Sequence, residues 1–174
     1  MKIGVIGAGR LGICFALLCE QAGYEVVVSD CREDYVKGLQ NHTIETNEPE
    51  VQRMLLESTN LTATTSNQEV IEACDIIYTL VATPSLADGS YDVSSVWRVV
   101  DDFKNSSLKL NGKTLVVGCT TNPGDCEKFA EQLDYFGVEV FYNPEFIAQG
   151  SIVRDLRQAD LVLIGGNNSL IYAD

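Results

Sequence analysis

Short runs of apolar, often β-branched residues alternate along the chain with longer stretches in which apolar residues recur at the spacing of an amphipathic helix. Most of the short runs are continuously apolar, which is typical of parallel strands that are buried on both faces of a sheet. The pattern predicts strands at 2–6, 25–29, 61–64, 75–81, 114–119, 138–142 and 161–164.

The stretches between these runs predict helices at 10–22, 33–41, 68–73, 93–104 and 126–136. Gly23 and Gly137 follow the first and the last of these helices, where glycine commonly ends a helix. Strands and helices that alternate in this order indicate an α/β fold with a doubly wound, mostly parallel, Rossmann-like sheet. With no internal repeat and no linker, we expect a single domain over residues 1–174. Only eight residues follow the glycine pair at 165–166, so we expect this domain to be part of a longer protein.

Acidic residues outnumber basic ones by 25 to 12, which gives a formal net charge of −13. That charge disfavours nucleic acids and anionic membrane surfaces as partners, because both require clusters of Lys and Arg. No run of 18 apolar residues and no signal peptide are present, so no membrane association is expected. The six cysteines include no C-x-x-C pair and the chain has one histidine, so we expect reduced thiols, no metal site and a cytoplasmic location.

Residues 7–12 read Gly-Ala-Gly-Arg-Leu-Gly, the pattern G-x-G-x-x-G, between the first predicted strand and the first predicted helix. Gly7 permits the tight turn, Gly9 lets a pyrophosphate approach the backbone, and Gly12 lets the helix lie close to the strand. The helix N-terminus offers unpaired N–H groups and a partial positive charge to phosphates. The turn therefore predicts a dinucleotide site with these cofactor-binding residues: Gly7, Gly9, Arg10, Leu11 and Gly12.

Asp30 ends the second predicted strand, eighteen residues after Gly12. A carboxylate at this place accepts hydrogen bonds from the hydroxyls of the adenosine ribose and repels a 2′-phosphate, so NAD is favoured over NADP. Arg32 lies two residues further on and could tolerate a 2′-phosphate, which leaves NADP as an alternative. A nucleotide-free relic of the fold, with Asp30 as a turn residue, is the other alternative.

The run at 75–81 leads into the polar loop 82–92, which we expect at the carboxyl end of a strand, where this architecture binds ligands. Pro84 forces Thr83 into an extended conformation, and we expect the Thr83 hydroxyl to face the crevice. An ordinary turn would fit the spacing equally well.

At this point the sequence resembles the N-terminal NAD-binding domain of the UDP-glucose/GDP-mannose dehydrogenase family, across nearly all of its length. The opening MKIGVIGAGRLG, the segment 36–49 with Glu48-Pro49, and the loop VATPS with Asp88-Gly89 and Tyr91-Asp92 carry part of the resemblance. The turn at 119–124 is similar to the STVPPG-type turn of the family. The most specific match is YNPEFIAQGS at 142–151, which resembles the family's NPEFL-x-EG signature.

The resemblance implies an NAD-dependent enzyme that oxidises the C6 alcohol of a UDP- or GDP-sugar to the uronic acid with two NAD. It implies that the three glycines and Asp30 bind NAD and that Thr83 contacts the cofactor. Thr120 matches a threonine that helps to hold the catalytic water, and it is also expected to bind the cofactor. Glu145 matches the acid/base glutamate. Phe146 and Ile147 match the wall of the sugar-nucleotide site. Partial desolvation beside Pro144 would also raise the pKa of Glu145 towards catalytic use, and a surface loop glutamate is the alternative.

The sequence departs from the family pattern at several positions. Gln149 replaces the second glutamate of the signature, Tyr35 stands where Lys or Arg is common, and Cys119 and Asn122 alter the STVPPG-type turn. The family's cysteine nucleophile belongs to a C-terminal domain, and its lysine and asparagine belong to the joining segment. None of these three is present, and we do not expect Cys119 or Cys126 to replace the nucleophile. We therefore expect this chain to be inactive alone, and a homodimer only in a full-length form, since the central helix makes that contact.

Two alternatives remain open at this stage. One is another β-hydroxyacid-type dehydrogenase, such as a 3-hydroxyacyl-CoA or 6-phosphogluconate relative. The other is a stand-alone dinucleotide-binding module without catalysis, which Gln149 and the missing C-terminal residues favour.

Overall fold

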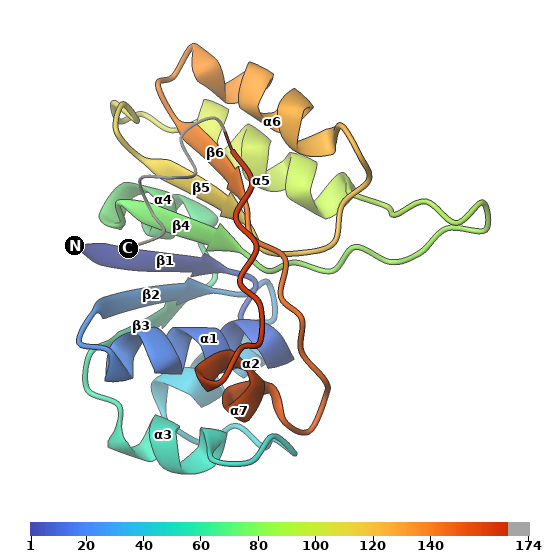
Figure 1. Ribbon diagram of the computed structural model, residues 1–174. Helices are drawn as coiled ribbons and strands as arrows, with labels where there is room; N and C mark the ends of the chain where they lie inside the picture. The colour runs from blue at the N-terminus through green and yellow to red at the C-terminus, as the bar shows by residue number, and fades with distance from the viewer. Residues whose placement is uncertain (167–174) are drawn as a thin grey trace.

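The computed structural model describes residues 1–166, and its centre is one sheet of six parallel strands (Figure 1). The strands lie in the order β3-β2-β1-β4-β5-β6, which is the doubly wound order with a switch point between β1 and β4. The final part of the domain expected over 1–174 lies outside the described residues. The strand bounds are β1 Lys2–Ile6, β2 Glu25–Ser29, β3 Leu61–Thr64, β4 Ile76–Thr79, β5 Thr114–Val117 and β6 Glu139–Tyr142.

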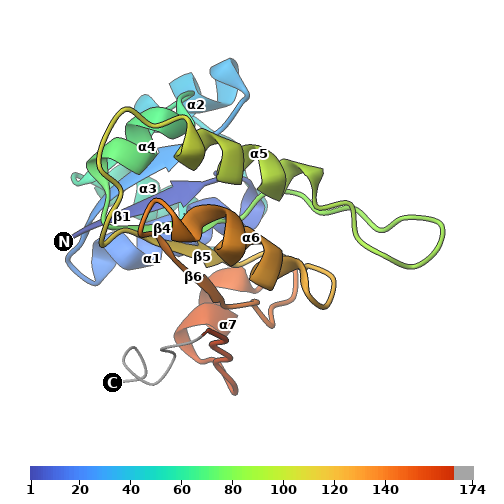
Figure 2. The same ribbon diagram turned by 90° about the horizontal axis from the view of Figure 1, so that it is seen from above.

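Helices cover both faces of this sheet (Figures 1 and 2). On one face lie α1, α3 and α7, on the other lie α4, α5 and α6, and α2 packs beside β3 at the edge. The bounds are α1 Arg10–Gln21, α2 Glu33–Gln40, α3 Val51–Glu57, α4 Asn67–Ala73, α5 Ser94–Lys104, α6 Asp125–Asp134 and α7 Ile152–Arg157.

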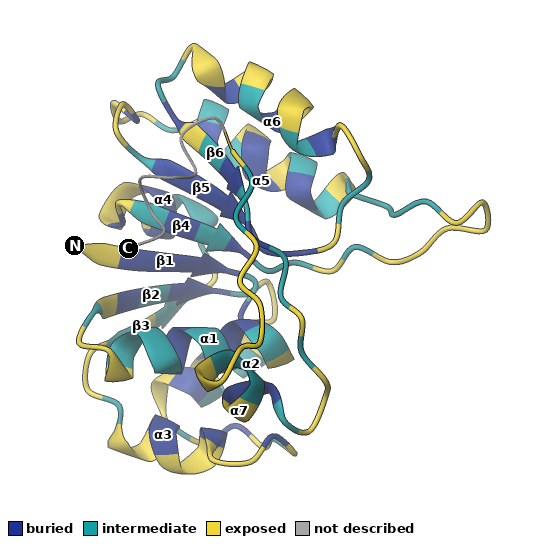
Figure 3. Ribbon diagram, viewed as in Figure 1, coloured by how far each residue is buried: buried dark blue, intermediate teal, exposed yellow. Residues whose placement is uncertain are grey.

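The strands separate two apolar cores, one beneath each layer of helices (Figure 3). Val96, Val100 and Phe103 of α5 belong to the core on one face, and Ile13 and Leu17 of α1 belong to the core on the other. All four residues of β5 are buried. Continuous burial of this kind is the reason why the central strands read as apolar runs and do not alternate, whereas the edge strands β3 and β6 are only partly buried.

The predicted α/β class, the parallel sheet and six of the seven strands are confirmed, with ends that differ by a few residues. The strand predicted at 161–164 is wrong. That segment has no regular secondary structure, and only Gly165 next to it pairs with β6, through two backbone hydrogen bonds of 2.8 Å with Tyr142. Leu161 and Val162 stay 60% and 64% exposed. An apolar run becomes a strand only when a neighbouring backbone pairs with it, and among residues 1–166 this run has no such partner.

Helices α3 and α7 were not predicted, and both are short. They have seven and six residues, about the length of the predicted helix α4, so length alone does not explain why the pattern failed to indicate them. Packing supplies what the pattern lacks, because Val51, Leu55, Ile152 and Val153 are buried in the core beside α1.

Candidate active site

The carboxyl ends of the strands form the edge of the sheet where the candidate residues gather. Ile6, Ser29, Thr79, Val117 and Tyr142 are in register in one row across β1, β2, β4, β5 and β6. Every sequence-predicted site residue follows one of these strand ends within a few positions. The parallel arrangement therefore places the loops that bear these residues along one side of the molecule.

The glycine turn after β1 is fixed by contacts of the backbone itself. Gly7 has a φ of +97°, which side-chain-bearing residues rarely adopt, and its N–H donates to the Ser29 carbonyl at 2.9 Å. The N–H of Ala8 donates to the same carbonyl at 3.0 Å. A Cβ added to Gly12 would collide with the Gly7 carbonyl oxygen, so α1 can lie against the turn only with glycine there.

Gly9 leaves the space in front of this turn open. Apart from the two neighbouring residues in the chain, a Cβ added to Gly9 would have no described atom within 4 Å. The α1 N-terminus that begins at Arg10 carries no side-chain cap and no acidic residue in its first turn, as far as residues 1–166 show. Its first N–H groups are therefore available to an anion, and an open cradle with free donors fits the pyrophosphate of a dinucleotide.

Asp30 follows β2 beside this turn and is engaged by Arg32. The guanidinium donates from Nε to Oδ1 at 2.8 Å and from Nη2 to Oδ2 at 2.9 Å, and the Arg32 N–H donates to Oδ1 at 3.1 Å. Burial by itself would raise the pKa of Asp30, but the hydrogen bonds and charge of Arg32 outweigh burial and lower it. Asp30 is therefore ionised, and both of its oxygens are engaged by Arg32.

Thr83 lies half-buried in the loop between β4 and α5, which projects far from the body of the protein (Figure 1). The arm of this loop closes through a bridge between Ser85 and Tyr91. Asn122 anchors its base, because Oδ1 accepts from the Tyr91 N–H at 2.8 Å and Nδ2 donates to the Tyr91 carbonyl at 3.0 Å. In the sequence Asn122 stands out only as a departure from a family turn, whereas in the structure its amide joins two loops.

Thr120 is exposed in the turn after β5, directly next to the buried Cys119. Burial raises the pKa of the Cys119 thiol to about 12, and burial also raises the pKa of Cys126. A thiol attacks as its thiolate, so neither cysteine is suited to act as a nucleophile at neutral pH. All six cysteines lie in the described part of the chain, where none is in a disulfide.

Glu145, Phe146 and Ile147 follow β6 and point to different surroundings. Glu145 lines a small cavity of about 210 Å³ together with Phe15 and Leu18 of α1, and burial raises the pKa of its carboxyl group. Ile147 packs against the core beside α1, whereas Phe146 is 60% exposed. The segment thus presents one desolvated carboxyl group and one exposed aromatic ring at the edge of the sheet.

A buried carboxylate from a distant part of the chain holds this segment in place. Glu48 is 5% exposed and accepts hydrogen bonds from the Gly150 N–H at 2.7 Å and from the Ile152 N–H at 3.4 Å. The segment also reaches the glycine turn, because Arg10 Nη1 donates to Gln149 Oε1. The sequence suggested Glu48 only as part of a family insert, and nothing in its local pattern indicates which backbone it would bind.

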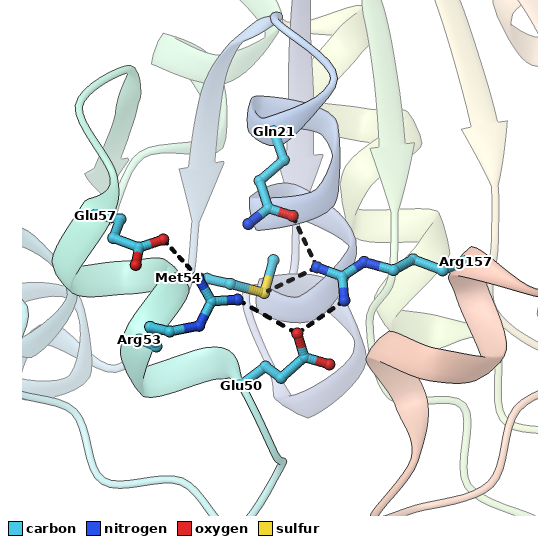
Figure 4. A network of polar contacts seen from close by, with 6 residues as sticks. All are labelled: Gln21, Glu50, Arg53, Met54, Glu57 and Arg157. Atoms are coloured by element: carbon cyan, nitrogen blue, oxygen red, sulfur yellow. Dashed lines mark hydrogen bonds and ion pairs between the residues drawn. The ribbon is translucent and has the colours of Figure 1, made fainter.

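Polar contacts between α7, α1 and the start of α3 also help to hold this part of the chain in place (Figure 4). Arg157 of α7 donates to Glu50 Oε2 at 2.8 Å and to Gln21 Oε1 of α1 at 2.9 Å. Glu50 also accepts from Arg53 at 3.3 Å. These contacts connect the start of α3 to α7, which directly follows the segment that carries Glu145.

Comparison with known proteins identifies the family and the fold. The sequence model described as "UDP-glucose/GDP-mannose dehydrogenase family, NAD binding domain" matches residues 1–172. The chain belongs to this family. A UDP-glucose 6-dehydrogenase of Pseudomonas aeruginosa is 30% identical over 174 residues, which are 95% of this chain and 38% of that protein. One of Rhizobium meliloti is 30% identical over 178 residues, with 97% and 40% covered.

Solved structures of the family agree. A UDP-glucose dehydrogenase from Pyrobaculum islandicum superposes with a TM-score of 0.83 at 26% identity, over 96% of this chain and 41% of that one. A GDP-mannose dehydrogenase from Pseudomonas aeruginosa has a TM-score of 0.86 at 22% identity, over 95% and 41%, and supports the fold. The chain spans about two fifths of the length of these relatives.

The family match identifies the chain as an NAD-binding domain, so its cofactor is NAD. The alternative of a different β-hydroxyacid-type dehydrogenase family is thereby set aside. In the part of the chain that the structure describes, no helix is long and apolar enough to cross a membrane. The same residues include no group of three or more His, Cys, Asp or Glu that could hold a metal ion.

Proposed function

We propose that the chain is the NAD-binding part, one domain over residues 1–174, of an enzyme that oxidises a UDP- or GDP-sugar to its uronic acid with two NAD. The observation that carries the proposal is the contact of Arg10 with Gln149. It brings the dinucleotide turn and the segment of Glu145 together at the edge where this fold binds ligands.

In this proposal the backbone of the glycine turn holds NAD. The N–H groups at the start of α1, from Arg10, Leu11 and Gly12, would bind the pyrophosphate in the open space at Gly9, and Asp30 would accept the ribose hydroxyls. Thr83 and Thr120 would contact the cofactor from the loops after β4 and β5. NAD supplies the hydride acceptor for the oxidation.

Glu145 would act as the acid/base and Thr120 would help to hold the catalytic water. Burial raises the pKa of Glu145, so its carboxyl group exchanges a proton closer to neutral pH than an exposed glutamate does. Phe146 and Ile147 would form a wall for the sugar nucleotide, with the exposed ring of Phe146 offering the apolar surface.

The rest of the machinery would come from outside this chain. The sugar nucleotide would bind between this domain and a C-terminal domain that provides the thiol nucleophile, and a homodimer would form in the full-length, cytoplasmic protein. The curated relatives, which are named UDP-glucose 6-dehydrogenases, extend well beyond the matched residues, and this supports the proposal of a further domain.

The test is to purify the 174-residue chain and measure both binding and turnover. We expect calorimetry to show NAD binding, and we expect no NADH production from UDP-glucose, GDP-mannose or UDP-N-acetylmannosamine. Turnover above background with any of these substrates would refute the claim that the chain is inactive alone. In a longer form, Glu145→Gln and Thr120→Ala should each reduce kcat far more than they weaken NAD binding.

Gln149 favours a second candidate, a dinucleotide-binding module without catalysis. The amide bonds to Arg10 but cannot exchange a proton as a carboxyl group would. Gln149→Glu in a longer form distinguishes the two. If the protein is an enzyme, the variant should retain or raise the rate, whereas a module would show no turnover before or after the change.

A further inference from the structure

Asp30, the carboxylate expected to receive the adenosine ribose, has both of its oxygens occupied by one guanidinium group. Arg32 binds them in a fork, with distances of 2.8 Å and 2.9 Å. The Asp30 side chain is 8% exposed and that of Arg32 is 56% exposed. The cation therefore covers the carboxylate from the solvent side, and the pair rather than Asp30 alone faces an incoming ribose.

Tyr35 of α2 holds this cation from the other side. The guanidinium carbon of Arg32 lies 4.1 Å from the centroid of the Tyr35 ring, within the range of a cation–π contact. The ring is itself partly buried against the core beside α1, so it forms a firm support. Arg32 is thus fixed by a carboxylate on one side and by an aromatic ring on the other, before any ligand binds.

This arrangement changes how the site treats a 2′-phosphate. A lone carboxylate would repel that group, and the repulsion is the usual basis for NAD preference. Here the positive charge of Arg32 offsets the negative charge of Asp30. The fork uses Nε and Nη2, so Nη1 retains donors that could bind a phosphate.

We propose that Arg32, held on the ring of Tyr35, is a specificity-determining residue that narrows the preference of this domain for NAD over NADP. The inference rests on the proposed cofactor site at Asp30. It predicts that the natural chain binds NAD only several-fold more tightly than NADP. Without Arg32, the repulsion between Asp30 and the 2′-phosphate should make this difference in affinity much larger.

Lys37 provides a matched control on the same helix. Its ammonium group pairs with Asp34 at 3.6 Å and with Glu33 at 4.0 Å. Lys37→Ala therefore removes one positive charge from α2, as Arg32→Ala removes one beside it, but leaves the contacts of Asp30 in place. Tyr35→Phe preserves the ring under Arg32, whereas Tyr35→Ala removes it.

The experiment measures the Kd of NAD and of NADP for each purified variant by calorimetry, with circular dichroism to verify the fold. In Arg32→Ala we expect NADP binding to weaken by at least about tenfold, the effect of losing a charge-assisted hydrogen bond, and NAD binding to change by less than about threefold. Tyr35→Ala should give a smaller shift of the same sign. Lys37→Ala and Tyr35→Phe should leave the ratio of the two Kd values within about twofold of the natural one.

An unchanged ratio in Arg32→Ala, or a ratio that Lys37→Ala moves equally, would overturn the inference while NAD binding itself stands. Equal weakening of both cofactors would also overturn it, because Arg32 would then act on the part that the two cofactors share. If the natural chain bound neither cofactor, the proposed site and this inference would both fail.

Discussion

The glycine turn and the segment 143–151 lie beside each other but are held in different ways. Gly7 and Ala8 of the turn bond to the end of the adjacent strand, and Gly12 packs against Gly7 itself. The segment is held at Gly150 by Glu48, which is 102 residues away in the sequence. A backbone motif therefore forms the proposed cofactor half of the site, whereas long-range side-chain contacts place the other half.

Substitutions at two glycines of the turn should have the largest effects, one on NAD binding and the other on the stability of the fold. Gly9→Val should reduce NAD affinity by at least about 100-fold with the fold intact, because the new side chain enters only the open space of the pyrophosphate. Gly12→Val should instead lower the free energy of unfolding by about 3 kcal/mol, since its Cβ meets the Gly7 carbonyl. Calorimetry and thermal melts measure both; a Gly9→Val protein that binds NAD normally would contradict the assigned cradle.

A substitution of Glu48 tests whether long-range contacts hold the segment 143–151 in place. Glu48→Ala leaves the N–H groups of Gly150 and Ile152 without their acceptor, so we expect a loss of about 2–3 kcal/mol in the free energy of unfolding. The exposed Glu45→Ala nearby should cost less than about 0.5 kcal/mol. Denaturant titration compares the two variants, and equal losses would show that Glu48 does not anchor the segment.

A substitution of Arg157 tests the more exposed contacts between α7 and the residues around it. Its ion pair with Glu50 is partly exposed, so Arg157→Ala should lower stability by about 1 kcal/mol or less. Hydrogen exchange should quicken in α7 and leave the amides of β1 unchanged. Faster exchange in both regions would mean that the two halves are not held separately.

Glu145 gives the smallest effect, and it depends on pH. Burial raises the folded-state pKa of Glu145, so the folded protein holds a proton that the unfolded chain has released between the usual glutamate pKa and the raised one. Stability contributed by this group therefore falls as pH rises through that window. Glu145→Gln should raise the melting temperature by at most about 3 °C at pH 7 and leave it unchanged near pH 4.

The control for this pH effect is Glu131→Gln, which removes the same charge from an exposed position on α6. An equal gain in both variants would trace the stabilisation to the net charge of −13 and not to burial of Glu145.

The fold was largely predictable because central strands such as β1 and β5 are buried on both faces and read as apolar runs. The same rule misled at 161–164, where an apolar run stays exposed and only Gly165 next to it pairs with β6. Apolar character predicts burial, but a strand also needs a partner backbone, which the run itself does not specify. The short helices α3 and α7 were missed for the opposite reason, since packing against α1 stabilises them more than their own pattern does.

The sequence by itself determined the parallel α/β sheet and the dinucleotide turn. Both depend on local physics: the period of apolar residues, and glycines where a side chain would strain the backbone or collide. Only the tertiary structure decided that Arg32 covers Asp30 on the ring of Tyr35, that Glu48 anchors Gly150, and that Arg10 meets Gln149. These contacts depend on how side chains orient and on which loops the folded sheet brings together, and neither follows from spacing along the chain.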